Sequence, residues 1–136
     1  MNSAKTEVTE LIGVYHADGG PVGEAKYVLG KLLGTAHCAL CDITHSPVRR
    51  KPQWDALVTR LGVPVTLVHL NEMPGDVAAA TAVTGTPVVL ARLSDGSLQP
   101  ALGAQELDQL GGSVDDFETA LLTSYARNGW SPAGTH

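Results

Sequence analysis

Segments that have the pattern of a β-strand alternate with segments that have the pattern of an α-helix, and this alternation limits the possible folds more than any other feature of the chain. Stretches rich in β-branched and aliphatic residues predict the strands, and apolar residues spaced three and four positions apart predict the helices. Strands joined through helices require right-handed crossovers and form a largely parallel sheet. The sequence therefore predicts an α/β protein with helices on both faces of a mostly parallel central sheet.

The predicted strands differ in character. They span Val8–His16, Thr35–Thr44 (a strand, or a strand and a turn), Val63–Leu70, Val88–Leu93 and Leu98–Leu102. The run Val63–Leu70 is apolar almost throughout, which is typical of a strand buried on both faces. Turn residues at Ser94–Ser97 separate the last two strands and predict a C-terminal antiparallel hairpin, in which Pro100 indicates an edge strand.

The predicted helices are bounded by turn and capping residues. They span Glu24–Leu33, Pro52–Leu61, Pro74–Val83, Gln105–Leu110 and a final segment that begins after Ser113. Pro52 fits the first helical turn, where its missing N–H is harmless, and Ser113 is a favourable N-cap. From Asn128 onward we expect a loose tail that includes Trp130.

The chain length fits one domain, because two domains cut from 136 residues would each bury too small a core. Apolar residues make up 43% of the chain and charged residues 17%, as in ordinary globular proteins. We expect residues 7–127 to form the domain and residues 1–6 and 128–136 to be flexible termini.

The charge balance argues against two classes of partner. Fourteen acidic residues against nine basic ones give a net charge of −5, whereas nucleic acids and anionic membrane surfaces attract basic faces. No stretch approaches the roughly 20 apolar residues that span a bilayer, and the polar N-terminus lacks the apolar core of a secretory signal. The sequence therefore predicts a cytoplasmic protein that binds neither nucleic acid nor membrane.

The densest group of reactive side chains lies in residues 37–45, which hold both cysteines and two of the five histidines. In an extended strand, Cys38 and Cys41 would point to opposite faces about 10 Å apart, whereas a disulfide needs Cα atoms within roughly 7 Å. The two thiols can therefore act together only if the chain turns between them. In an extended chain, His37, Cys41 and His45 would share one face.

Three interpretations of this segment stay open. In the first, Cys38 and Cys41 form a dithiol that exchanges with the disulfide of a substrate. In the second, the two cysteines with His45 or His37 bind zinc or copper through sulfur and imidazole ligands. In the third, the cysteines are buried thiols that act as small hydrophobic residues.

Three histidines follow predicted strands. His16, His45 and His69 lie at or just beyond the C-terminal ends of successive predicted parallel strands, and this edge of an open α/β sheet is where ligands bind. A neutral imidazole there is a ligand or a general base, although each ring can also simply cap a strand end with a hydrogen bond. Asn71 and Glu72 follow His69 closely enough for either side chain to orient its ring.

One further motif gives the pattern a family resemblance. Thr86-Pro87 precedes the strand Val88–Leu93, and the C-x-x-C follows the second predicted strand. This order of elements and motifs resembles the thioredoxin-like superfamily. The segment 85–103 is also similar to that family's run of cis-proline, strand, turn, return strand and glycine. The resemblance implies a single thioredoxin-like domain in which Pro87 is cis and lies beside the dithiol.

The resemblance also implies roles for individual residues. Cys38 would be the attacking thiol and Cys41 the resolving thiol, with His37 or His45 tuning the thiolate. The other predicted site residues would bind a protein or small-molecule thiol or disulfide substrate; they are Thr86, Pro87, His16 and His69.

The sequence also departs from the family. The C-x-x-C of the family opens a helix, whereas the residues D-I-T-H-S-P after Cys41 predict no regular helix there. Asp42 places a negative charge beside Cys41, which disfavours a thiolate. His37 stands where the family has an aromatic residue. An interaction module that keeps the fold without the chemistry is therefore a further alternative.

The chain as a whole is similar to small bacterial proteins that sometimes carry a GTPase label, and its residues argue against that activity. A phosphate-binding loop needs G-x-x-x-x-G-K-[ST]. Around Gly30-Lys31, Ala25 occupies the position of the first glycine and Leu32 follows the lysine. We therefore expect no P-loop GTPase activity.

Overall fold

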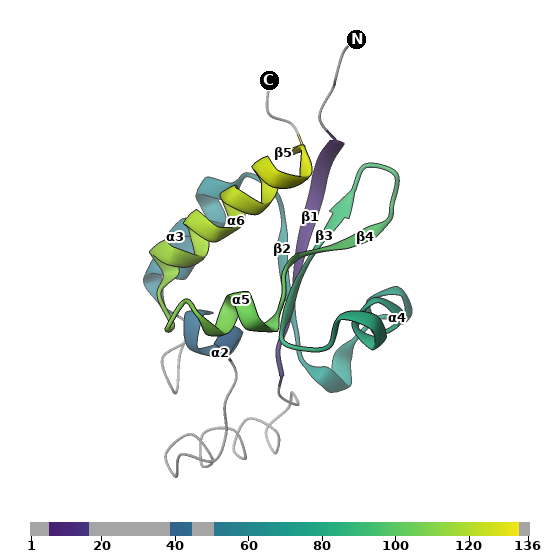
Figure 1. Ribbon diagram of the computed structural model, residues 1–136, viewed down its shortest axis with the longest axis horizontal. Helices are drawn as coiled ribbons and strands as arrows, with labels where there is room; N and C mark the ends of the chain where they lie inside the picture. Colours follow the sequence, from purple (N-terminus) through teal and green to yellow (C-terminus); the bar gives the residue numbers. More distant parts are fainter. Residues whose placement is uncertain (1–5, 17–38, 45–50, 134–136) are drawn as a thin grey trace.

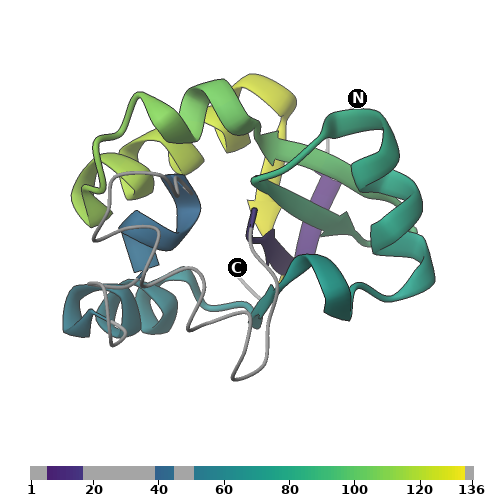
Figure 2. The same cartoon turned by 90° about the horizontal axis from the view of Figure 1, so that it is seen from below.

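A computed structural model of the protein describes residues 6–16, 39–44 and 51–133. These residues form one α/β domain in which a central sheet lies between two layers of helices (Figure 1). Helices α2 (Ala39–Thr44), α3 (Pro52–Leu61), α5 (Ala104–Asp108) and α6 (Val114–Asn128) cover one face of the sheet, and α4 (Gly75–Thr84) covers the other (Figures 1 and 2). The α/β class and the helices on both faces are confirmed.

The sheet is mixed rather than mostly parallel. Its strands are β1 (Thr6–Val14), β2 (Val65–Val68), β3 (Val88–Leu93), β4 (Leu98–Leu102) and β5 (Trp130–Pro132), in the order β2-β1-β3-β4 with β5 paired to β1. Strand β1 is parallel to β2 and β5, whereas β3 is antiparallel to both of its neighbours. The expectation of a mostly parallel sheet is therefore wrong.

The direction of β3 depends on the edge of the sheet at which α4, the preceding helix, ends. The residue Thr86, just before β3, contacts His16, just after β1. The chain thus enters β3 at the edge where β1 ends, so the two strands must run in opposite directions. Alternation of strands and helices in a sequence does not show at which edge a helix ends.

The second predicted strand is also wrong over its described part. Ala39–Thr44 is helix α2, and residues 35–38 lie outside the described residues. Leu40 and Ile43 are fully buried, and their spacing of three places both side chains on one face of a helix. Burial of these two side chains in the main core outweighs the β-propensity of Ile43 and Thr44.

The apolar run Val63–Leu70 contributes a shorter strand than expected. Only Val65–Val68 forms β2, which stands at one end of the strand order. Its residues are half-buried or exposed, so the prediction of a strand buried on both faces is wrong. The remaining apolar residues leave the sheet, and Leu70–Glu72 forms the short 3₁₀ helix η1.

The C-terminal half follows the sequence closely. Helix α3 has Pro52 at its start and ends at Gly62, whose φ of 73° is left-handed. Ser113 caps α6 by accepting a hydrogen bond of 3.1 Å from the backbone N–H of Asp116. The hairpin β3–β4 has the predicted bounds, and Pro100 lies on a strand that ends the sheet. The predicted helix Glu24–Leu33 lies outside the described residues.

The expected loose tail contains a strand. Trp130–Pro132 forms β5 and pairs in parallel with Thr6–Val8 of β1. Trp130 is 7% exposed and lies against Tyr125, with 6.4 Å between ring centroids. A buried tryptophan gives this segment the apolar anchor that a frayed terminus lacks, so the prediction that residues from 128 onward are loose is wrong for this part.

Two apolar clusters fill the two layers. The larger one joins β1 to α2, α3, α5 and α6, and in it Trp54 meets Phe117 edge-on at 5.1 Å. The smaller one lies under α4 and includes Ile12, Val77 and Leu90. Among the described residues, no helix is long and apolar enough to cross a membrane.

Candidate functional site

Four elements meet at the edge of the sheet where β1 and β2 end. Tyr15 and His16 follow β1, and His69 follows β2. Thr86 precedes β3, and the last residue of α2, Thr44, reaches the same edge through Tyr15. The sequence placed His16 and His69 at the ends of parallel strands, and the parallel pairing of β1 with β2 confirms that placement.

His16 is bound to the turn that precedes β3. Its Nδ1 lies 2.9 Å from Oγ1 of Thr86, and the side chain of His16 is exposed. The Thr86–Pro87 peptide bond is cis, as the sequence resemblance implied. Two residues predicted for the site from separate patterns, His16 and Thr86, are therefore in direct contact.

His69 is held by Glu72 in two ways. The Oε1 atom of Glu72 lies 2.8 Å from Nδ1 of the ring and 3.1 Å from the backbone nitrogen of His69. The hydrogen bond from the His69 ring is the main cause that lowers the pKa of the Glu72 carboxyl. His69 retains an exposed fraction of 25%. The sequence named Asn71 and Glu72 for this role, and the ring is bound by Glu72.

Tyr15 links His69 to α2. Its ring centroid lies 5.0 Å from that of His69, with 59° between the ring planes. Its hydroxyl forms a hydrogen bond of 2.7 Å with Oγ1 of Thr44, and both residues are buried. The sequence interpretation missed this pair. The available signal was a tyrosine directly after an apolar strand, since a buried phenol requires a polar partner.

The predicted cysteine site lies mostly outside the described residues. His37, Cys38 and His45 are not among them, and Cys41 is placed only as a residue of α2. The backbone nevertheless corrects two expectations. The extended arrangement of this segment is wrong for residues 39–44, and so is the prediction that no regular helix surrounds Cys41.

No metal site appears in the part of the chain that the structure describes, where no group of three histidine, cysteine, aspartate or glutamate side chains could hold an ion. The ligands that the sequence suggested for zinc or copper are Cys38, Cys41, His45 and His37. Three of them lie outside the described ranges, so the metal prediction remains an alternative that the geometry does not test.

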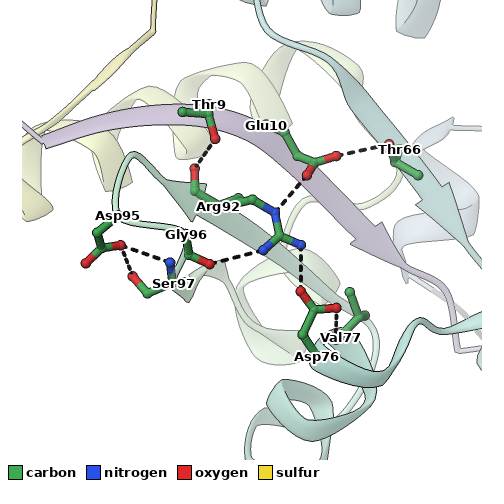
Figure 3. A network of polar contacts seen from close by, with 9 residues as sticks. All are labelled: Thr9, Glu10, Thr66, Asp76, Val77, Arg92, Asp95, Gly96 and Ser97. Atoms are coloured by element: carbon green, nitrogen blue, oxygen red, sulfur yellow. Dashed lines mark hydrogen bonds and ion pairs between the residues drawn. The ribbon is translucent and has the colours of Figure 1, made fainter.

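A second polar cluster lies away from this edge, between the sheet and α4 (Figure 3). The Arg92 guanidinium donates to Glu10 Oε1 at 2.9 Å, to Asp76 Oδ2 at 2.8 Å and to the carbonyl of Gly96 at 3.1 Å. Its hydrogen bonds to the two carboxylates raise the pKa of Arg92, and the hydrogen bond from Arg92 lowers the pKa of Asp76. This cluster ties β3 to β1, to α4 and to its own hairpin turn.

The chain was compared with protein-family models, curated proteins and solved structures. No family model matches the chain, and no curated protein and no solved structure matches it either.

Proposed function

We propose that the protein carries out thiol–disulfide exchange with Cys38 and Cys41, in a domain of the thioredoxin-like type. The observation that carries the proposal is the helical backbone of Ala39–Thr44. Helical residues three apart have Cβ atoms about 5–6 Å apart, and a disulfide needs Cα atoms within roughly 7 Å. Ala39 and Leu40, which stand between the two cysteines in the sequence, are helical rather than extended, and this supports the proposal; Cys38 itself lies outside the described residues.

The turn before β3 supports the same proposal. The family resemblance implied a cis-proline beside the dithiol, and the Thr86–Pro87 bond is cis. Thr86 is fixed by His16 at the end of β1, and α2 reaches that end of β1 through the Thr44–Tyr15 hydrogen bond. In the proposal, Thr86 and Pro87 form the rim against which a disulfide substrate lies.

The reaction balances without a further reactant. The Cys38 thiolate attacks one sulfur of the substrate disulfide, forming a mixed disulfide and releasing the other substrate sulfur as a thiol. The Cys41 thiol then attacks Cys38, which releases the second substrate thiol. The substrate disulfide is reduced to two thiols while the protein dithiol is oxidised to a disulfide.

A pair of matched substitutions tests this function. Reduced wild type, Cys38→Ser and Cys41→Ser are mixed with a small aromatic disulfide, and the products are identified by mass spectrometry. Wild type should end two hydrogens lighter, Cys41→Ser should stop as a mixed disulfide, and Cys38→Ser should lose rapid exchange. Full exchange by Cys38→Ser would contradict the assignment.

The same sample separates the alternatives. A native mass spectrum that is heavier by one zinc or copper ion, and that reverts on denaturation, would favour the Cys/His metal site. Thiols that react slowly in every variant, with no ion bound, would favour an interaction module without this chemistry.

A further inference from the structure

The outer edge of β2 has backbone groups that face away from the sheet. On the inner edge, the N–H of Tyr15, just after β1, donates to the carbonyl of Val68 at 2.9 Å. Backbone groups of successive residues in a strand point to opposite edges. The N–H and C=O groups of Val65 and Leu67 therefore point away from β1, and no strand among the described residues pairs with them.

The residues on either side of this stretch have their backbone groups bound. After β2, the N–H of His69 donates to Glu72 Oε1 at 3.1 Å, and its carbonyl accepts from the N–H of Glu72 at 3.0 Å. Before β2, the carbonyl of Pro64 accepts from Leu11 of β1 at 2.9 Å, and proline has no N–H. The outer edge thus presents two donors and two acceptors, those of Val65 and Leu67, as a template for another strand.

The two end strands of the order β2-β1-β3-β4 differ in how they are protected. Strand β4 contains Pro100, which lacks an N–H, and its register with β3 shifts between Val89 and Leu90; both features block pairing at an edge. Strand β2 contains no proline and no charged side chain, and its register with β1 is regular throughout. Only the edge of β2 is therefore suited to a further strand.

The charges around β2 allow a second copy of the chain to approach there. The net charge of −5 makes two copies repel each other on average. Residues 61–71, however, contain no Asp, Glu, Lys or Arg. Glu10, which accepts from the Thr66 hydroxyl at 3.5 Å, is itself bound by Arg92 at 2.9 Å. A contact between copies at β2 thus avoids the acidic residues that oppose association elsewhere.

Strand β2 is also complementary to itself. When two copies run antiparallel about a two-fold axis at Thr66, Val65 of each copy lies opposite Leu67 of the other. These are the outward-facing residues, so the two opposed pairs exchange four N–H···O=C hydrogen bonds. Thr66 faces its counterpart with Cα atoms about 4.5 Å apart. Its side chain is exposed, and facing threonines form a favourable cross-strand pair.

We propose that two copies of the protein associate through β2, which joins their sheets into one continuous sheet. This inference is independent of the thiol chemistry proposed above, since it uses no cysteine. The contact involves one strand of four residues from each copy. Interfaces that small belong to weak, reversible complexes, so the dimer should have a Kd on the order of tens of micromolar.

Sedimentation velocity over a concentration series tests the dimer. Reduced wild type should change from monomer to dimer between about 1 and 500 µM. Thr66→Lys puts two like charges opposite each other at the axis and should raise the Kd by about tenfold or more. Gln99→Lys is the matched control, because it makes the same change of charge at an exposed residue of the other end strand. It should dimerise as wild type does.

A disulfide trap keeps the test decisive if Thr66→Lys does not fold, which circular dichroism would show. Thr66→Cys is made in a chain that also carries Cys38→Ser and Cys41→Ser, and is oxidised in air. Cα atoms about 4.5 Å apart across the axis are within the range that a disulfide spans. Thr66→Cys should therefore form a dimer linked through residue 66, whereas Gln99→Cys in the same background should stay monomeric.

Each other outcome contradicts the inference. Wild type that stays monomeric at every concentration would exclude the dimer. A dimer that Thr66→Lys leaves intact, or that Gln99→Lys weakens equally, would place the contact away from β2. A dimer of Thr66→Cys that does not become linked through residue 66 would exclude antiparallel pairing about Thr66.

Discussion

The two polar clusters on the sheet use their hydrogen-bonding groups in opposite ways. The Arg92 guanidinium donates hydrogen bonds to two carboxylates and a carbonyl, and Glu10 also accepts from Thr66 at 3.5 Å (Figure 3). At the edge where β1 and β2 end, Glu72 binds one ring nitrogen of His69, and the other nitrogen has no hydrogen bond from the described residues. The first cluster satisfies its charges internally and holds elements together. The second holds an imidazole in a fixed orientation with 25% of its side chain exposed.

Loss of the buried hydrogen bond between Tyr15 and Thr44 should have the largest effect on stability. Tyr15→Phe removes the hydroxyl that pairs with Thr44 at 2.7 Å, and a buried polar group that loses its partner costs about 1–3 kcal/mol. Urea unfolding should show a loss of that size.

A double-mutant cycle sharpens this prediction. Thr44→Val should destabilise the protein alone, and adding it to Tyr15→Phe should cost less than the sum of the two single losses. Additive losses would show that the two hydroxyls do not stabilise each other.

Replacement of Arg92, which lies at the centre of the polar cluster between the sheet and α4, should have the next largest effect on stability. Arg92→Met breaks bonds to Glu10, Asp76 and Gly96 at once. Since the Arg92 side chain is 26% exposed, solvent screens these pairs, and we expect a loss of about 1 kcal/mol that shrinks at high salt. Exchange activity should not change.

The ion pair of Arg60 with Glu118 provides a control for the substitution of Arg92. Arg60 binds a single carboxylate, that of Glu118, at 2.9 Å. Arg60→Met should destabilise less than Arg92→Met in the same urea series. Equal losses would show that the connections of Arg92 to three partners add nothing.

Tyr125 gives a third case, with a polar group that is buried and has no partner among the described residues. Its hydroxyl is buried and has no hydrogen-bond partner in the described part of the chain, and burial raises its pKa to about 12. The raised value means that folding favours the neutral hydroxyl. Ionisation of this hydroxyl therefore leaves the free energy of unfolding unchanged below the ordinary tyrosine pKa of about 10 and lowers it as the pH rises toward 12.

Replacing this hydroxyl should stabilise the protein slightly. Tyr125→Phe should raise the free energy of unfolding by about 0.5–1 kcal/mol at neutral pH, because a buried group without a partner carries a desolvation cost. The variant should also lose less stability than wild type between pH about 10 and 12. A destabilised variant would indicate a partner for the hydroxyl.

The smallest expected change concerns the carboxyl of Glu72. Its pKa is lowered chiefly by the ring of His69, so any stability it contributes is present above the ordinary glutamate pKa and is lost as the pH falls through the lowered value. In a carboxyl NMR titration, His69→Asn should move this pKa upward. An unchanged titration would show that the ring does not stabilise the carboxylate.

The sequence predicted best where residue chemistry fixes local structure. Ser113, Gly62 and the hairpin residues at 94–97 set the boundaries of α3, α6 and β3–β4, because caps and turns depend on a few neighbouring residues. It failed at α2, where Leu40 and Ile43 suit a strand and a helix equally well. The outcome there depends on the core that surrounds them.

The site was predicted in part for a similar reason. His16 and His69 were placed by their positions at strand ends, and the pair Asn71-Glu72 by its closeness to His69 in sequence. The contacts of His16 with Thr86 and of Tyr15 with Thr44 join residues 70 and 29 positions apart. Such contacts depend on the direction of β3, in a sheet that the sequence predicted to be mostly parallel, and on the helical form of α2, which the sequence predicted as a strand.

The place of β5 has a consequence for synthesis on the ribosome. Strand β3 occupies one side of β1 along most of its length, so β2 and β5 must share the other side at different heights. The strand made first therefore obtains its last partner only after Trp130 has been added. A nascent chain held before that point would expose the first residues of β1 as an unpaired edge, open to pairing with other chains.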